Sequence, residues 1–205
     1  MRNRIICTIL VLNSFIACNT FSQYTYWEDL SKDEQHNMLL NKDVNKLIYT
    51  AYAKNYDMLS DKDNLAETII SILLHNKNGE IEPLYFYLFN KACYVSDAGL
   101  SESIEYPCLD MTLRNTQYLF EYFTRQIKKN ENKLLNIYAS LIGYDLFYLY
   151  PTLRYKERLL KISGTFTPEQ KTTINIFLKK IDLTIKDLKI EDSKVKSEEL
   201  KLKSK

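Results

Sequence analysis

Two stretches with almost no charged side chains constrain most strongly how this chain can fold. The first is LYFYLFNKACYV at residues 84–95, and the second covers residues 134–150. Pro83 suits the first turn of a helix, and Pro151 would end the second stretch. Because a helix without a polar face is usually buried on all sides, the sequence predicts two central helices with other elements packed around them.

Capping patterns mark where other helices begin. Ser31 is followed three residues later by Glu34, which forms a capping box and predicts a helix to about Leu40. Thr167 precedes Pro168 and is followed three residues later by Gln170, which predicts the start of the last helix.

The rest of the chain also has helical periodicity. Apolar residues recur every three or four positions, which is typical of amphipathic helices. We expect a break at Ser96–Gly99, a turn before Pro107 and a polar link at 128–132. Further helices are expected near 44–51, 63–73, 109–113, 118–127 and 151–161, the last closed by Gly164.

Few residues favour tight turns, since the 205-residue chain has only four glycines and four prolines. The predicted fold is therefore all-α, with about seven or eight helices in one domain over residues 23–190. No repeat of 20–50 residues is visible by identity. An irregular helical bundle and a degenerate α-solenoid both remain open.

The last helix carries a seven-residue spacing of apolar residues: Ile174, Ile181, Leu188, Val195 and Leu202. Its companion positions change from Leu178 and Ile185 to Asp192 and Glu199. We therefore expect packing to about Leu188, followed by a solvated Lys/Glu-rich tail over 191–205. Pairs at i,i+4 support the helix: Asp182/Lys186, Asp192/Lys196 and Glu199/Lys203. The acidic residues argue against a basic membrane-surface helix.

The N-terminus has the layout of a secretory signal. Arg2 and Arg4 precede an apolar run at 5–17, which at 13 residues is shorter than the ~20 needed to span a bilayer. A buried first helix of the domain is the alternative. We expect export, with the mature protein periplasmic or secreted.

Two processing sites compete in the stretch SFIACNTFSQ. A lipobox ending in Ala17 would make Cys18 the lipidated first residue and would anchor the protein to a membrane, although Phe15 occupies the usual leucine position. Cleavage after Ser22 would instead start the mature chain at Gln23. The second is favoured, because Thr20 and Ser22 are the small residues that such cleavage needs.

The charge balance excludes one class of partner. The chain has 28 Lys+Arg and 26 Asp+Glu, and loss of Arg2 and Arg4 with the signal leaves 26 of each. Nucleic-acid binding needs a surplus of positive charge. We therefore expect no nucleic-acid partner, and membrane association only through a lipid on Cys18.

Cysteine usage suggests a disulfide. Cys7 lies in the signal, and Cys18 is either lost or lipidated, which leaves Cys93 and Cys108. Disulfides persist in exported proteins, so we expect these two to pair. The alternative is two buried free thiols that pack as small hydrophobic groups.

Asp145 is the most unusual polar residue, because it lies in a helix that is otherwise almost uncharged. A carboxylate in such a place must be paired, hydrogen-bonded or at a groove. One hypothesis is a ligand pocket in which Asp145 works with nearby Tyr148, Arg154, Tyr155 and Arg158. The other is a structural contact inside the core. A pocket requires Asp145 in a cleft with an arginine within reach.

Catalytic and metal motifs are missing. The chain has no HExxH, CxxC, GxSxG or glycine-rich phosphate loop, and only two histidines, His36 and His75. A zinc site built on Asp33 and His36 is disfavoured, and we expect no metal or cofactor.

The sixteen tyrosines fit helix contacts or a binding patch. We expect most of them in the core and a minority in an exposed patch.

The leading hypothesis is a non-enzymatic module of the cell envelope with a protein or peptide partner. One form is a small protective protein that masks an incoming toxin. The alternative is a hydrolase or ligand-binding protein that uses the Asp145 pocket.

Overall fold

The protein is an all-α helical bundle, as a computed structural model describes it for residues 24–40, 52, 71, 82–96, 98–148 and 152–203. These residues contain no strand. Their elements are η1 (Trp27–Asp29), α1 (Lys32–Leu39), α4 (Pro83–Val95), α5 (Ala98–Arg114), α6 (Thr116–Lys128), α7 (Lys133–Tyr148), α8 (Thr152–Ile162), η2 (Ser163–Thr165) and α9 (Pro168–Lys203).

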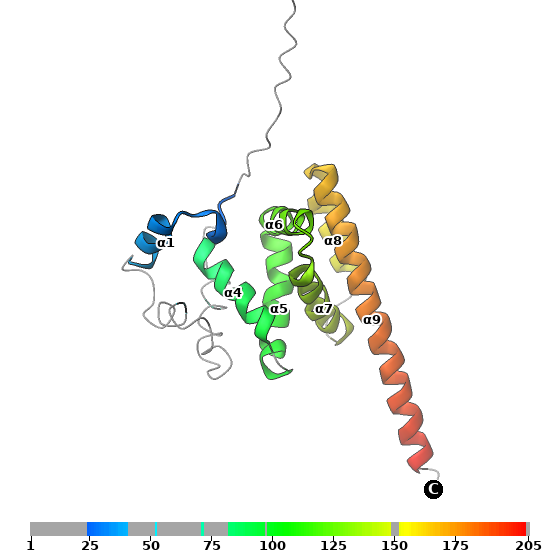
Figure 1. Cartoon of the computed structure of the whole chain (residues 1–205). Coiled ribbons are helices and arrows are strands. Elements are labelled where there is room, and N and C mark those ends of the chain that lie inside the picture. Colours follow the sequence, from blue (N-terminus) through cyan, green and yellow to red (C-terminus); the bar gives the residue numbers. More distant parts are fainter. Residues whose placement is uncertain are drawn as a thin grey trace, which may run out of the picture.

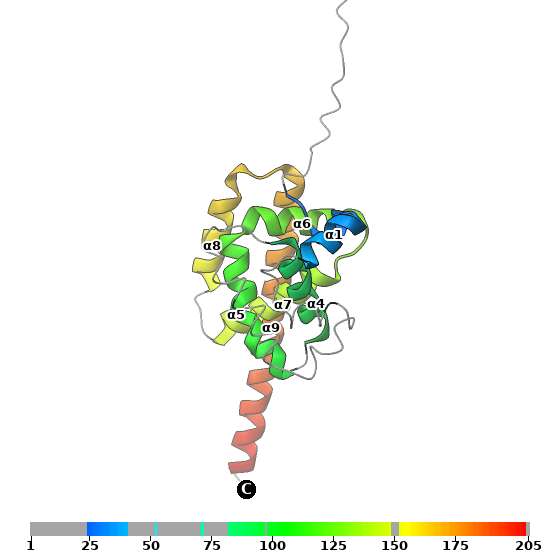
Figure 2. The same ribbon diagram turned by 90° about the vertical axis from the view of Figure 1, so that its left-hand side faces the viewer.

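Helix α7 lies at the centre of the described bundle (Figures 1 and 2). It packs against α4, α5 and α9, and most of its side chains are buried. Helix α4 is also buried along most of its length, so both predicted central helices are confirmed. In a solenoid each hairpin contacts only its neighbours in sequence. Here α9 packs on both α6 and α7, which makes the fold a bundle.

Aromatic rings join the helices at the core. The Phe123 ring of α6 lies 5.3 Å from the Tyr138 ring of α7 in an edge-to-face contact. Phe120 meets Phe177 of α9 in the same geometry at 5.2 Å. Edge-to-face pairs are favoured by the charge distribution of aromatic rings, so these contacts fix how α6, α7 and α9 sit together.

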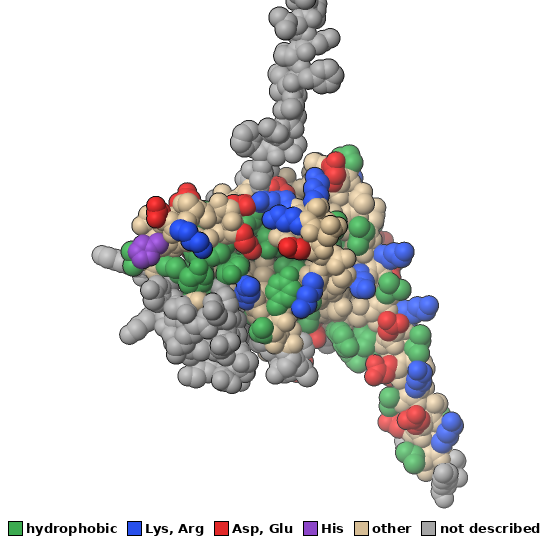
Figure 3. Space-filling view, viewed as in Figure 1, with side chains coloured by type: hydrophobic (Ala, Val, Ile, Leu, Met, Phe, Trp, Pro, Cys, Tyr) green, Lys and Arg blue, Asp and Glu red, His purple; other side chains and the backbone are tan. Residues whose placement is uncertain are grey.

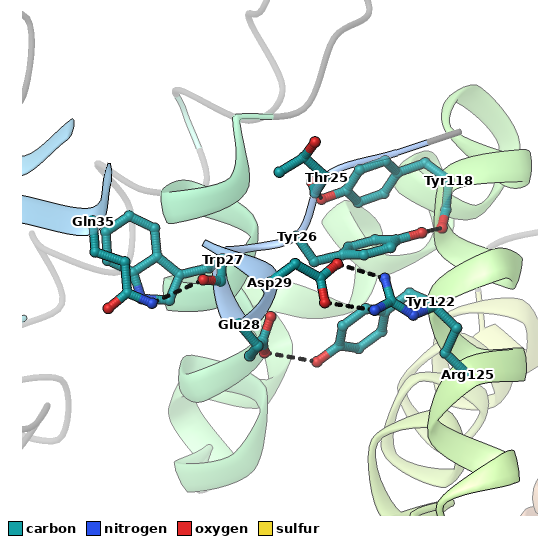
Figure 4. Close-up of polar contacts among 9 residues, drawn as sticks. All are labelled: Thr25, Tyr26, Trp27, Glu28, Asp29, Gln35, Tyr118, Tyr122 and Arg125. Carbon is teal, nitrogen blue, oxygen red and sulfur yellow. Dashed lines mark hydrogen bonds and ion pairs between the residues drawn. The ribbon is translucent and has the colours of Figure 1, made fainter. Parts of the chain in front are cut away.

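The first described residues are docked on α6 (Figure 4). The Tyr26 hydroxyl donates a hydrogen bond to the backbone carbonyl of Tyr118 at 2.9 Å. Arg125 donates to both carboxylate oxygens of Asp29, at 2.5 and 2.7 Å, and lies 4.8 Å over the Tyr26 ring. This combination of a buried aromatic, a bidentate ion pair and a cation–π contact holds the N-terminal segment against the bundle.

Both predicted capping boxes are confirmed. The backbone N–H of Glu34 donates to the Ser31 hydroxyl, and the backbone N–H of Ser31 donates to the Glu34 carboxylate. Thr167 and Gln170 make the corresponding pair of hydrogen bonds at the start of α9. Both predictions hold because a capping box depends only on atoms within one turn of the chain.

The predicted turn before Pro107 is wrong. Helix α5 runs from Ala98 to Arg114 with Pro107 inside it, and the break after α4 is limited to residues 96 and 97. Proline removes one hydrogen bond from a helix, but Ile104, Pro107 and Cys108 are all buried here. Burial of this face offsets the lost bond. The predictions for 1–22, 44–51, 63–73 and Pro151 lie outside the described residues.

Helix α9 is continuous over 36 residues and projects beyond the other helices (Figures 1 and 2). Its inner side chains are buried as far as Leu188, whereas Val195 and Leu202 on the same line are exposed. The Asp192–Lys196 pair is present at 2.7 Å. The expected Asp182–Lys186 pair is not, because Asp182 pairs with Lys156 of α8 instead. The side chain of Lys203 is outside the described part, so its pairing stays a prediction.

Helices α7 and α9 approach closely at Gly143, and this contact gives a test. A Cβ added at Gly143 would lie 2.8 Å from both Cβ and Cγ2 of Thr184. Gly143→Ala should gain about 1 kcal/mol of helix propensity but lose about 1–3 kcal/mol to overpacking. We expect a net loss in the free energy of unfolding, measured by urea denaturation.

The matched control is Gly164→Ala. A Cβ at Gly164 meets no atom within 4 Å. This variant should stay within about 1 kcal/mol of the original protein. Equal stability of the two variants would show that the α7–α9 contact is looser than described.

Candidate functional site

Asp145 is sealed in the bundle. Its side chain lies on α7 with only 2% of the residue exposed, and its Oδ2 atom has no hydrogen-bond partner. Burial raises the pKa of this carboxyl above its usual value. Burial and the negative charge of Asp145 both raise the pKa of Glu105 on α5. The charged group that Asp145 affects is therefore another acid.

The other members of the predicted pocket lie elsewhere. Arg154 and Arg158 are exposed on α8, and among the described residues neither forms an ion pair with Asp145. Tyr148 is 69% exposed. Tyr155 is buried, with its hydroxyl 2.7 Å from Oγ1 of Thr112. In the described structure no ion pair or hydrogen bond joins these five residues to one another, and their role as a ligand site stays a prediction.

The predicted disulfide is not formed in this structure. Cys93 and Cys108 are both buried, and their sulfur atoms lie 4.0 Å apart, twice the length of a disulfide bond. Burial and the neighbouring Cys93 raise the pKa of the Cys108 thiol well above its usual value. A thiol in this state is a poor nucleophile. The pair instead corresponds to the alternative of two free thiols packed in the core.

Nothing in the described residues groups into a metal site. Helix α1 carries Asp33 and the exposed His36, but no set of three His, Cys, Asp or Glu side chains in this part of the chain could hold an ion. The described helices also include none with the length and apolar content that crossing a membrane requires.

A polar hollow of about 580 Å³ lies between α4 and α7. It is lined by Cys93, Tyr94, Ser96, Asn132, Lys133, Asn136, Ile137, Ser140 and Leu141. The Lys133 ammonium lies 5.3 Å from the Tyr94 ring centre, so part of its charge is already satisfied. None of the residues of the predicted pocket lines this hollow.

The most regular surface feature is on the outer side of α9. Ile176, Leu183 and Ile190 recur every seven residues and are 45%, 44% and 46% exposed. Lysines lie three or four positions from these aliphatic residues, and residues at such spacing are neighbours on a helix surface. We call this line of side chains the outer row; it consists of Ile176, Lys179, Leu183, Lys186, Ile190 and Lys194.

Hydrophobic, basic and acidic side chains alternate along the exposed surface of α9 (Figure 3). A shallow hollow of about 440 Å³ surrounds Ile190 and is lined by Lys186, Lys189, Ile190, Ser193, Lys194 and Ser197. The inner side of the same helix is buried, so the row faces away from the core.

The outer row was not predicted, although the sequence contains a pattern that indicates it. Ile176, Leu183 and Ile190 have the same seven-residue spacing as the inner line Ile174, Ile181 and Leu188. The inner line has more apolar companions and therefore dominates the pattern. Only the packing of α9 on α6 and α7 separates a buried line from an exposed one.

Comparison with known proteins gives no relative from which a site could be transferred. The chain matches no protein-family model, no curated protein and no solved structure.

The buried carboxyl of Asp145 predicts a pH-dependent stability. Its pKa in the folded state is raised above the unfolded value of about 3.9, so its ionised form destabilises the fold at higher pH. Asp145→Asn should reduce this pH dependence, and Glu105, whose pKa burial also raises, should keep the remainder. Relative to the original protein, the variant should gain stability as pH rises through the folded-state pKa of Asp145.

The measurement is urea denaturation between pH 4 and 8 on both proteins. Asp187→Asn, an exposed site on α9, is the control and should leave the pH profile of stability unchanged. A loss of several kcal/mol for Asp145→Asn at neutral pH would contradict the prediction, because it would reveal a partner for the carboxylate.

Proposed function

We propose that this chain is an exported, non-enzymatic helical module that binds a protein or peptide partner through the outer row of α9. The observation that carries the proposal is the periodic exposure of Ile176, Leu183 and Ile190 on one straight helix. Single exposed aliphatic residues are normal on protein surfaces. Their repetition every seven residues places them on one line along the helix, which is one of the two lines of a helix-packing seam, and lysines occupy the other.

The dimensions of the outer row support this reading. From Ile176 to Lys194 the helix rises about 27 Å, which is the length of a five-turn partner helix. The hollow around Ile190 offers a place for one partner side chain. Because α9 projects beyond the bundle, a partner lying along its end would meet few other elements of the described structure (Figure 1).

Export remains part of the proposal and rests on the N-terminal sequence. A mature chain starting at Gln23 would keep every described residue that is docked on α6, from Tyr24 onward. The first described segment lies at the end of the bundle opposite the free end of α9 (Figures 1 and 2). If Cys18 were lipidated instead, residues 19–23 would span at most about 18 Å, and α9 would point away from the membrane.

The processing step predicts a definite mass. The intact protein from the soluble fraction of cells that make it should have the mass of a chain beginning at Gln23. A mass beginning at Cys18 with acyl chains, found in the membrane fraction, would identify an anchored lipoprotein. An unprocessed mass beginning at Met1 would contradict export.

Partner binding is tested by photo-crosslinking in those cells. A photoreactive phenylalanine analogue in place of Leu183 or Ile190 should give a discrete adduct of higher mass on irradiation. The matched control is Leu160 on α8, which is exposed to a similar degree and should give none. Leu183→Glu should abolish the adduct formed from position 190, since a carboxylate would disrupt apolar packing. Adducts of equal yield at all three positions, or none at 183 and 190, would contradict the proposal.

A further inference from the structure

We infer that the partner of the outer row is an acidic amphipathic helix, with its aliphatic residues seven positions apart and glutamate or aspartate beside them. This inference rests on the proposed function and specifies the chemistry of the partner. It depends on how the charges of α9 are distributed around the helix, which the linear sequence conceals.

The outer row carries a one-sided positive charge. Lys179, Lys186 and Lys194 are all exposed, and each lies within one turn of at least one exposed aliphatic residue of the row. The lining of the hollow at Ile190 contains three lysines and two serines and no carboxylate. Two acidic residues flank this part of the row: Asp187, four positions after Leu183, and Asp182, three positions after Lys179, which pairs with Lys156 of α8. A partner side chain packing near Ile190 would therefore meet ammonium groups.

The acidic residues of the projecting end are divided between two sides. Asp192 and Glu199 follow Leu188 and Val195 by four positions and continue the buried line. Glu191 and Glu198 lie three positions before and four positions after Lys194, so they flank the last lysine of the outer row. The hollow at Ile190, which is lined by three lysines and no carboxylate, is therefore the part of the row with the clearest positive charge.

The lysines around Ile190 give α9 a local basic face. This positive charge limits which kinds of molecule can pack on the outer row. A second copy related by a twofold axis would set lysines against lysines, which disfavours a symmetric dimer. A membrane-surface helix buries a broad apolar face, whereas the outer row has one aliphatic residue in two turns. An acidic amphipathic helix would pack against the apolar residues and pair with the lysines of the row. Its negative charge would also speed association.

The test uses the purified protein and two synthetic helical peptides of equal length. Both peptides carry leucine at the same seven-residue spacing, one flanked by glutamates and the other by lysines at the same positions. Fluorescence anisotropy should show the glutamate peptide binding at least about tenfold more tightly than the lysine peptide. Its affinity should fall about tenfold between 50 and 300 mM salt, because exposed charges are screened.

Lysine variants separate the outer row from general charge. Lys179→Gln, Lys186→Gln and Lys194→Gln together should weaken binding of the glutamate peptide about tenfold. The control combines Lys128→Gln, Lys161→Gln and Lys171→Gln, which removes the same charge from exposed positions outside the row and should leave binding unchanged. Circular dichroism should show equal helix content in both triple variants.

Several results would overturn the inference. They are equal or tighter binding of the lysine peptide, no binding of either peptide, or equal effects of the two triple variants. Tighter binding to phosphatidylglycerol vesicles than to the glutamate peptide, lost in the outer-row variant, would identify a membrane instead. A dimer in sedimentation that Leu183→Glu dissociates would identify a second copy.

The two proposals fail in different ways. Crosslinks from positions 183 and 190 without a charge preference among the peptides would leave the proposed function standing and remove only the acidic partner. Binding of the glutamate peptide without crosslinks in cells would confirm the surface chemistry and remove the proposed function.

Discussion

The close packing of α7 on α9 is the contact on which the rest of the described structure depends. Helix α7 is apolar on nearly every side, so it is stable only when other helices cover it. Gly143 lets the α9 backbone approach at Thr184, and α4 and α5 cover other parts of the same helix. With α7 covered in this way, α9 has one face committed to the core and the opposite face free.

The tyrosines divide according to whether their hydroxyl groups find a partner inside the bundle. Tyr138 is fully buried and donates to the side-chain oxygen of Asn90 at 2.8 Å. Tyr26 is buried, and its hydroxyl donates a hydrogen bond to the backbone carbonyl of Tyr118. Tyr144 and Tyr148, one turn apart on α7, remain exposed. Most of the described tyrosines that line the core thus act as large hydrophobic groups with one satisfied polar atom.

Asp145 and the outer row are the two most unusual features of the described structure, and they differ in burial and in charge. Asp145 is a buried carboxylate with an unpartnered oxygen, and its negative charge raises the pKa of another acid, Glu105. Burial destabilises the ionised form of Asp145, and no ion pair among the described residues compensates it. The outer row, by contrast, exposes aliphatic side chains together with positive charge. Burial of Asp145 lowers the stability of the fold, whereas the exposure of the outer row is the observation from which we propose a partner.

The sequence by itself determined the features that depend on neighbours within one or two turns of helix. Ser31 with Glu34 and Thr167 with Gln170 marked helix starts, because capping uses adjacent residues. The two stretches with almost no charged side chains marked α4 and α7 as central, because neither has a polar face. The all-helical class followed from the same periodicity.

The tertiary structure decided everything that depends on which surfaces meet. Pro107 stays within α5 because that face is buried, a fact that no local rule contains. Asp182 pairs with Lys156 of another helix and not with Lys186, and Arg154 and Arg158 are exposed and form no ion pair with Asp145 in the described structure. The inner and outer lines of α9 have equal spacing in the sequence. Packing against α6 and α7 buries one line and leaves the other in solvent, because a helix in a bundle can bury only the side that its neighbours cover.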